Sequence, residues 1–152
     1  VLKEGGEMFF SDVYSNVPVP ESLRTDPTLW GECISGALPF DAFLSMVQEV
    51  GFGPAYEVGG YEIVIQNEAI AALIKERAPD LKFFSKTMRL IKLPKNAKKE
   101  EKVDQKVVLK DGEEFLLSKD IIFDAMLPKW IEDPLVLAAL KETRYREHFD
   151  FL

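Results

Sequence analysis

Stretches typical of β-strands alternate with stretches typical of helices along the first 93 residues, and this alternation constrains the fold more than any other feature. Apolar and aromatic residues gather in Glu7–Tyr14, Tyr56–Ile65 and Phe83–Leu93, which favours strands. Between them, Asp41–Val50 has apolar residues at helical spacing, and Asn67 is placed to cap a second helix. The order strand, helix, strand, helix, strand predicts an α/β fold with helices layered on a sheet.

The first predicted strand, Glu7–Tyr14, is the most apolar of the three. Its composition suits a strand that is buried on both faces, as in a parallel sheet. Asp12 lies toward its carboxyl end, where open α/β sheets bind ligands, although a lone acidic residue there more often belongs to a turn or cap. Ahead of the strand, Val1–Lys3 resembles the last turn of a helix that Gly5 and Gly6 end, so we expect a longer parent protein.

A charged segment, residues 94–106, separates this region from the last third of the chain. Its sequence "PKNAKKEEKVDQK" is nearly free of apolar residues and predicts a linker or an exposed loop. After it, Asp111-Gly112 predicts a hairpin between two apolar runs, and Asp133-Pro134 predicts the start of a helix. We therefore expect three parts: residues 1–93, a linker at 94–106, and a small α+β C-terminal domain at 107–152.

The overall charge limits the partners of the chain. It has 19 Lys and Arg residues against 26 Asp and Glu residues, a net charge of −7, whereas nucleic acid binding needs clustered basic residues. The basic residues in 82–92 alternate with apolar ones and are best explained as solvated strand positions. We expect neither nucleic acid nor a membrane as partner, and the absence of a signal peptide or membrane-spanning run makes the cytoplasm the expected location.

Cys33, the only cysteine, lies in "LWGECISGAL" and permits three interpretations: a packed residue, a nucleophile or a ligand. A buried cysteine usually behaves as a small hydrophobic residue. His148 is the only histidine, and nothing in the sequence directs it toward Cys33, so we do not expect a catalytic Cys–His pair. One cysteine and one histidine also fall short of the four ligands of a structural zinc site. The residues alone leave the role of Cys33 open.

Four stretches of the sequence resemble the S-adenosylmethionine-dependent arsenite methyltransferases. They occur in the family's order: "VLKEGGEMFFSDVY" resembles VLKPGGxxxFSDVY, "DPTLWGECISGAL" resembles DPVLWGECLGGAL, "KFFSKTMRLIKLP" resembles a strand ending in TxRLFK, and "YREHFDF" resembles RFAxxF. The resemblance implies the C-terminal part of a Rossmann-like class I methyltransferase sheet, with about three strands and flanking helices, followed by the small α+β domain. It also implies that most of the S-adenosylmethionine site, including the glycine-rich loop, lies outside this chain.

The resemblance further implies a role for Cys33 as an arsenic-binding thiolate, since soft trivalent arsenic prefers sulfur. Asp12, Trp30 and Glu32 are expected to line the same site. The family carries a further cysteine at the position that matches either Leu81 or Lys86, and neither is a cysteine in this chain.

Two classes of function follow from these expectations. The first is the substrate-side part of an arsenite methyltransferase-like enzyme, inactive alone, that associates with itself or with the remaining N-terminal half. The second is a binding or interaction module in which Cys33 is simply packed; a methyltransferase with a different acceptor is a further alternative. The GEC motif with Asp26, Pro27 and Trp30 favours the first, and the missing second thiol favours the others.

Overall fold

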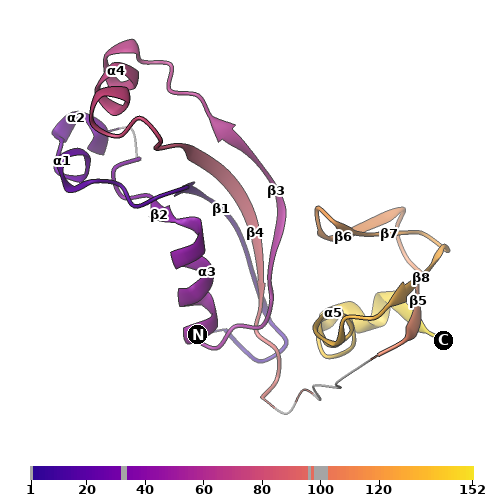
Figure 1. Ribbon diagram of the computed structural model, residues 1–152. Coiled ribbons are helices and arrows are strands. Elements are labelled where there is room, and N and C mark those ends of the chain that lie inside the picture. The colour runs from indigo at the N-terminus through magenta and orange to yellow at the C-terminus, as the bar shows by residue number, and fades with distance from the viewer. Residues whose placement is uncertain (1, 32–33, 96, 98–102) are drawn as a thin grey trace. The chain divides into compact units, whose positions relative to one another are not determined.

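The structure is a computed structural model that describes residues 2–31, 34–95, 97 and 103–152, and it shows a mixed α/β fold (Figure 1). The contacts within the chain define two compact units. One unit comprises Val1–Phe10, Val47–Val58 and Met88–Leu152, and the other comprises Ser11–Met46 and Gly59–Thr87. The division into a first part, a linker and a C-terminal domain stays a prediction, and only the end of the predicted linker differs in the structure.

Four strands form the main sheet, in the order β2-β1-β4-β3. They are β1 (Glu7–Ser15), β2 (Leu38–Pro39), β3 (Ala55–Ile63) and β4 (Phe83–Ile91). β2 runs parallel to β1, with Tyr14 opposite Leu38. β4 runs antiparallel to β1, because Gly5 bonds to Lys92 at one end whereas Asn16 bonds to Lys82 at the other. The three long strands confirm those predicted from the sequence.

The prediction that β1 is buried on both faces of a parallel sheet is wrong. Met8 and Phe9 are 44% and 54% exposed, and full burial begins only at Tyr14 and Ser15. β1 pairs in parallel only with the two-residue β2 and otherwise lies beside the antiparallel β4. Antiparallel sheets commonly leave one face to solvent. The apolar composition of β1 therefore reflects strand preference rather than burial on both sides.

The unit formed by Ser11–Met46 and Gly59–Thr87 gathers three helices where β1 ends and β4 begins: α1 (Glu21–Arg24), α2 (Pro27–Trp30) and α4 (Glu68–Arg77) (Figure 1). As predicted, Asn67 caps α4, and its side-chain oxygen accepts hydrogen bonds from the amides of Ala69 and Ile70 at 3.0 and 3.2 Å. An apolar cluster fills the space between these elements; its buried members are Val19, Leu23, Leu29, Ile34, Ile70, Ile74, Leu81 and Phe83. The helix predicted at Asp41–Val50 is α3 (Phe40–Glu49).

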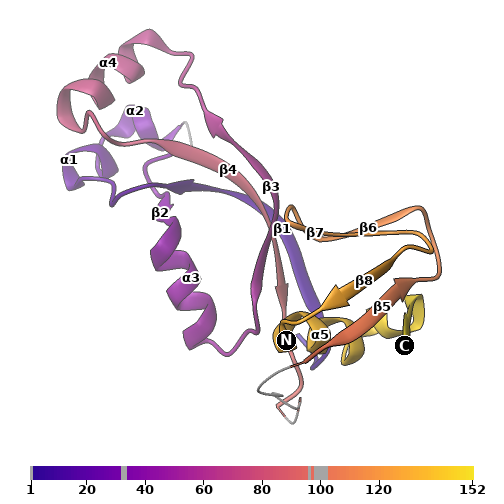
Figure 2. The same cartoon turned by 45° about the vertical axis from the view of Figure 1, so that its right-hand side comes forward.

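The other unit contains two small antiparallel sheets (Figure 2). β5 (Gln105–Leu109) lies between β8 (Pro128–Ile131) and β9 (Phe149–Phe151), while β6 (Glu114–Ser118) pairs with β7 (Ile121–Asp124). The helix predicted after Asp133 is α5 (Pro134–Lys141), which Asp133 caps by accepting from the amide of Leu135 at 2.8 Å. A short 3-10 helix, η1 (Arg144–His148), follows. Side chains from all these elements form one apolar core.

The hairpin predicted across Asp111-Gly112 is wrong. Gly112 does adopt the turn conformation that its sequence context favours, with φ +84°, but β5 and β6 do not pair with each other. β6 reverses through residues 119–120 to pair with β7, and β5 pairs with β8 and β9. A turn signal marks where the chain bends, whereas the pairing partner depends on which strands bury the most apolar surface together.

Two further sequence expectations need correction. Val103 is buried in the core and β5 begins at Gln105, so the end of the predicted 94–106 linker belongs to the folded unit. Leu2 and Lys3 are not helical, although Gly5 adopts the positive φ expected after a helix end. Instead, Lys3–Gly6 form a turn in which the amide of Gly6 donates to the carbonyl of Lys3, and hydrogen bonds join Gly5 and Gly6 to Lys92 at the end of β4.

Candidate functional site

The backbone on either side of Cys33 is held firmly, while Glu32 and Cys33 themselves lie outside the described residues. Before them, α2 begins at Pro27 and is capped by Asp26, whose carboxylate accepts from the amide of Thr28 at 3.0 Å. Leu29 is 1% exposed, and Ile34, the first described residue after the gap, is 4% exposed. Both belong to the apolar cluster of this unit. The described residues on both sides of the GEC motif are therefore anchored in one apolar cluster.

Arg77, at the end of α4, ties the α1–α2 segment to the rest of its unit. Its guanidinium donates to the backbone oxygen of Ser22 at 2.8 Å and lies 3.6 Å from a carboxylate oxygen of Asp26. Because Asp26 also caps α2, a single carboxylate connects the helix that precedes Cys33 to α4.

Trp30 is anchored at one end and exposed over the rest of its ring. Its indole N–H donates to the backbone oxygen of Arg24 at 2.7 Å, yet the residue is 69% exposed. It lines an open cavity of about 410 Å³ with Thr25 and Pro27. The structure thus presents a fixed aromatic face two residues before Glu32.

Asp12 lines a different cavity, of about 250 Å³, together with residues from β1, β2, α3 and the turn between them: Val13, Tyr14, Gly36, Ala37, Leu38 and Phe43. One carboxylate oxygen of Asp12 accepts from the amide of Val13 at 2.8 Å. Burial, and to a lesser extent the charge of Asp12, raises the pKa of the Tyr14 hydroxyl to about 12. The sequence pointed to Asp12 but not to Tyr14, and the structure does not place Asp12 and Trp30 in one cavity.

The two positions considered for a second cysteine have different surroundings. Leu81 is buried in the same apolar cluster as Leu29 and Ile34, which lie on either side of the GEC motif in the sequence. Lys86 instead places its ammonium 4.5 Å from the ring centre of Phe40. Of the two, only Leu81 shares an apolar cluster with described residues that are close to Cys33 in the sequence.

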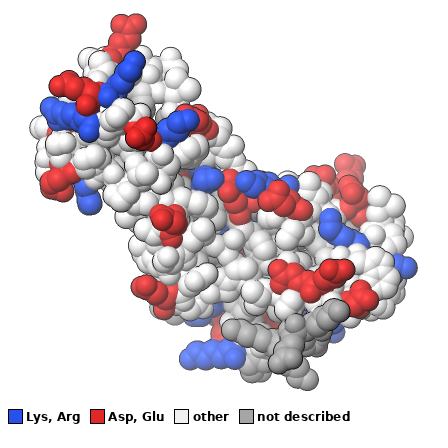
Figure 3. Space-filling model, in the orientation of Figure 1, with Lys and Arg blue, Asp and Glu red and all other residues white. Residues whose placement is uncertain are grey.

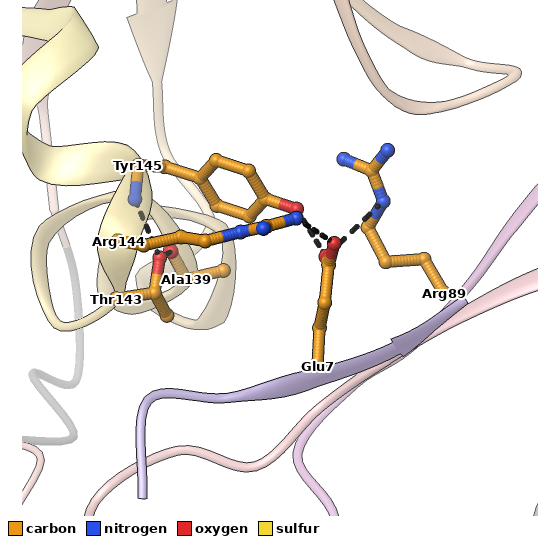
Figure 4. A network of polar contacts seen from close by, with 6 residues as sticks. All are labelled: Glu7, Arg89, Ala139, Thr143, Arg144 and Tyr145. Carbon is orange, nitrogen blue, oxygen red and sulfur yellow. Dashed lines mark hydrogen bonds and ion pairs between the residues drawn. The ribbon is translucent and has the colours of Figure 1, made fainter.

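A polar network that the sequence did not predict lies in the other unit (Figure 4). Glu7 accepts hydrogen bonds from Arg144 and from the hydroxyl of Tyr145, and the Nε atom of Arg89 lies 3.6 Å from its carboxylate. The guanidinium of Arg89 is surrounded by the rings of Phe9, Phe115 and Tyr145, at 5.0 to 5.5 Å from their centres. Burial and the bond to Glu7 raise the pKa of Tyr145.

The sequence contains parts of this network in its motifs, but they could be connected only once the structure was known. Arg89 is the arginine of "TMRLIK", and Tyr145 is the first residue of the "YREHFDF" stretch, which Arg144 directly precedes. Arg89 and Arg144 are far from Glu7 in the sequence, so their contacts with Glu7 could not be predicted. The network joins β1, β4 and η1, and we assign it a structural role.

The charged surface offers little that suggests a polyanionic partner. On the face drawn in Figure 3, basic side chains are interspersed with acidic ones. Among the described residues, no three His, Cys, Asp or Glu side chains form a group suited to a metal ion. Within the same residues, no helix is both long and apolar enough to cross a membrane.

Known proteins similar to this chain are arsenite methyltransferases, although no protein family model matches it. The mouse enzyme is 35% identical over 156 residues, covering 99% of this chain and 39% of the mouse protein. The human enzyme is 35% identical over 154 residues, covering 98% of this chain and 39% of the human protein. The enzyme from Aquipseudomonas alcaligenes is 40% identical over 93 residues, covering 61% of this chain and 26% of the bacterial protein.

The fold also matches a solved structure. The crystal structure of CrArsM, an arsenic (III) S-adenosylmethionine methyltransferase from Chlamydomonas reinhardtii, superimposes with a TM-score of 0.84 and 29% identity, over 100% of this chain and 51% of that one. The fold is therefore part of a methyltransferase fold. More particularly, the chain corresponds to a C-terminal portion of the arsenite methyltransferase family. It spans about 39% of the length of its mammalian relatives.

Proposed function

We propose that this chain is the substrate-side part of an arsenite methyltransferase-like enzyme and that Cys33 is its arsenic-binding thiol. The observation that carries the proposal is the GEC motif, which follows a capped helix in a chain whose whole length matches part of arsenite methyltransferases. Both flanking residues, Leu29 and Ile34, are buried in one cluster, which gives the intervening residues a fixed start and end.

The proposed chemistry is the exchange of a hydroxyl for a thiolate on trivalent arsenic. The S–H bond of Cys33 and one As–O bond break, an S–As bond forms, and the thiol proton leaves with the hydroxyl as water. Sulfur is preferred because trivalent arsenic is a soft centre. With one cysteine in the chain only one such bond forms, so we expect weak binding.

We propose that this chain does not bind S-adenosylmethionine, the methyl donor named for the algal relative, by itself. The proposal rests on the sequence, which has no G-x-G-x-x-G motif of the kind that binds nucleotide cofactors in doubly wound folds. We therefore propose no cofactor contact in this chain and expect the chain alone to be inactive.

The proposal is tested by calorimetric titration of phenylarsine oxide, a trivalent arsenical, into the chain and into Cys33→Ser. We expect weak binding to the original chain and none to the variant. A thermal melt of both proteins checks that the substitution preserves the fold. If the two titrations are the same, Cys33 is not the arsenic-binding group.

The second candidate is an interaction module in which Cys33 is packed. It is favoured by Leu81, which occupies one of the two possible positions of the family's further cysteine with an apolar side chain. The rate at which Cys33 reacts with a disulfide reagent such as dithiobis(nitrobenzoate) distinguishes the two candidate functions. A packed thiol reacts only as fast as the protein opens, whereas a thiol presented to substrate reacts without unfolding.

A further inference from the structure

A larger cavity lies in the unit that comprises Val1–Phe10, Val47–Val58 and Met88–Leu152. It has a volume of about 520 Å³, against about 250 and 410 Å³ for the cavities at Asp12 and Trp30, and its described lining residues all belong to this one unit. They come from the end of α3 and the turn after it, from the segment that follows β4, and from α5. Small-molecule sites typically have volumes of about 300 to 1,000 Å³, so the cavity is large enough for one.

The walls of this cavity are held by hydrogen bonds within the chain. The amide of Gly53 donates to the carbonyl of Ile91 in β4 at 2.8 Å, and the amide of Ala97 donates to the carbonyl of Pro94 at 2.9 Å. A Cβ on Gly53 would lie 3.0 Å from that carbonyl of Ile91 and from the side chain of Leu93, so a glycine suits the close approach of these two walls. Small-molecule sites are usually formed in advance in this way.

The backbone around the cavity offers few free donors. Prolines, which lack an N–H group, occupy three of the lining positions: 54, 94 and 134. The amides of five other lining residues already donate hydrogen bonds within the chain: Gly51, Phe52, Gly53, Ala97 and Leu135. Phosphate sites are commonly built from several free backbone amides, so this lining disfavours a nucleotide.

Two exposed side chains, those of Gln48 and Lys95, supply polar groups to a wall that is otherwise mostly apolar. Lys95 is the only charged residue among the described lining residues, although the chain as a whole carries a net charge of −7. Its ammonium stands at the end of a flexible four-carbon stem, so it can turn toward a negative group bound at the cavity. The lining therefore favours an apolar molecule with one negative group.

We propose that this cavity binds a small monocarboxylate with an apolar body, such as an aliphatic acid of medium length. The apolar body packs against Phe52, Leu93 and Leu135. The carboxylate pairs with Lys95 and accepts a hydrogen bond from the side-chain amide of Gln48. Burial of the apolar body supplies most of the binding free energy, because an exposed ion pair contributes little, whereas the charge of Lys95 selects an anion over a cation.

Octanoate is the probe, and octylammonium, which has the same body with the opposite charge, is its control. We expect saturable shifts of the amide resonances of Gly51, Phe52 and Ala97 when octanoate is titrated into the 15N-labelled chain, and weaker binding of octylammonium. Lys95→Gln should weaken octanoate binding about two- to fivefold, the range expected for one solvent-exposed ion pair, without weakening octylammonium binding. Lys110→Gln, in the same unit but outside the cavity, should change neither.

A matched pair of variants on α3 tests the position of the site. Gln48→Trp places a large ring in the wall of the cavity and should weaken octanoate binding, whereas Glu49→Trp, which is equally exposed but does not line the cavity, should not. A thermal melt of each variant checks that it is folded.

The site does not depend on the proposed function, because the GEC motif belongs to the other unit. Cys33→Ser should therefore bind octanoate as tightly as the original chain, whatever its affinity for arsenicals. The proposal is overturned if the lining amides show no saturable shift, if octylammonium binds as tightly as octanoate, or if Lys95→Gln and Gln48→Trp both bind octanoate as well as the original chain.

Discussion

Leu81 is one of the two positions at which the resemblance implies a further cysteine of the family. It is buried in one apolar cluster with Leu29 and Ile34, which lie close to Cys33 in the sequence. A thiol at this position would make a second As–S bond intramolecular, and short connections of this kind raise effective concentration into the millimolar range or above. We therefore expect a cysteine at this position to strengthen the proposed binding of arsenic.

We predict that Leu81→Cys binds phenylarsine oxide at least tenfold more tightly than the original chain. Lys86→Cys is the matched control, since Lys86 lies over Phe40 instead of in this cluster, and it should leave the affinity unchanged. Calorimetry on both variants, with urea unfolding to confirm that each is folded, provides the measurement. If only Lys86→Cys binds phenylarsine oxide more tightly, position 86 and not position 81 is the place for a second arsenic-binding cysteine.

Tyr14 gives a second prediction, on alkaline stability. Its pKa is raised from 10.0 to about 12 in the folded chain. Between these values the unfolded chain has released the proton while the folded chain retains it, so the unfolded state binds fewer protons and stability falls as pH rises. We expect the free energy of unfolding to decrease more steeply from pH 10 to 12 in the original chain than in Tyr14→Phe.

Urea unfolding at several pH values measures this difference. Tyr61→Phe serves as the control, because Tyr61 is exposed, and it should follow the original chain. Parallel curves for the original chain and Tyr14→Phe would mean that the Tyr14 hydroxyl ionises as readily folded as unfolded.

At the scale of elements, the sequence predicts features that depend on neighbouring residues, such as the starts of helices. It does not predict features that depend on residues far along the chain, such as strand pairing. α4 and α5 begin where Asn67 and Asp133 place a side-chain oxygen against free backbone amides, and both starts were predicted. The exposure of β1 and the pairing of β5 were not, because each depends on strands far along the chain. The same reason explains which residues of the candidate site could be predicted. Asp12 was predicted from its position on a strand, whereas the burial of Tyr14 depends on its contact with Phe43 of α3, which the sequence does not reveal.

The network around Glu7 predicts a specific loss of stability. Glu7 and Arg89 are only 12% and 11% exposed at their side chains, and Glu7 is the one carboxylate shared by Arg89, Arg144 and Tyr145 (Figure 4). Glu7→Gln leaves these two cations without a counter-charge. Breaking a buried pair by removing one partner costs about 3 to 5 kcal/mol, so we expect a loss at the lower end of that range.

Urea unfolding of Glu7→Gln is compared with that of Lys110→Gln. Lys110 pairs with Asp150 at 3.8 Å, but their side chains are 38% and 57% exposed, and such solvent-exposed pairs contribute about 1 kcal/mol or less. Similar small losses in the two variants would mean that the Glu7 network adds no more than a surface ion pair.

At the scale of the whole molecule, the free edge of β1 is the feature with the widest consequence. β1 pairs with β2 only at Tyr14 and Ser15, so among the described residues the same edge of Glu7–Val13 has no strand partner. Met8 and Phe9 are exposed on this strand. An open, apolar strand edge is a template for pairing with another chain.

We therefore predict that the 152-residue chain associates with itself at high micromolar concentration and that Met8→Lys weakens the association, since edge charges oppose strand pairing. Val64→Lys is the control, because Val64 is also exposed but lies outside β1. Light scattering over a concentration series distinguishes the outcomes. A stable monomer throughout would show that the edge of β1 is protected from pairing.

We propose that the fold, and not merely the presence of a thiol, makes Cys33 an arsenic-binding group. Any accessible cysteine reacts with trivalent arsenic to some degree, so the direct test compares the affinity of the folded chain for phenylarsine oxide with that of the same chain unfolded in urea. We predict tighter binding by the folded chain. Equal binding would mean that the fold contributes nothing, and weaker binding by the folded chain would identify Cys33 as a packed residue.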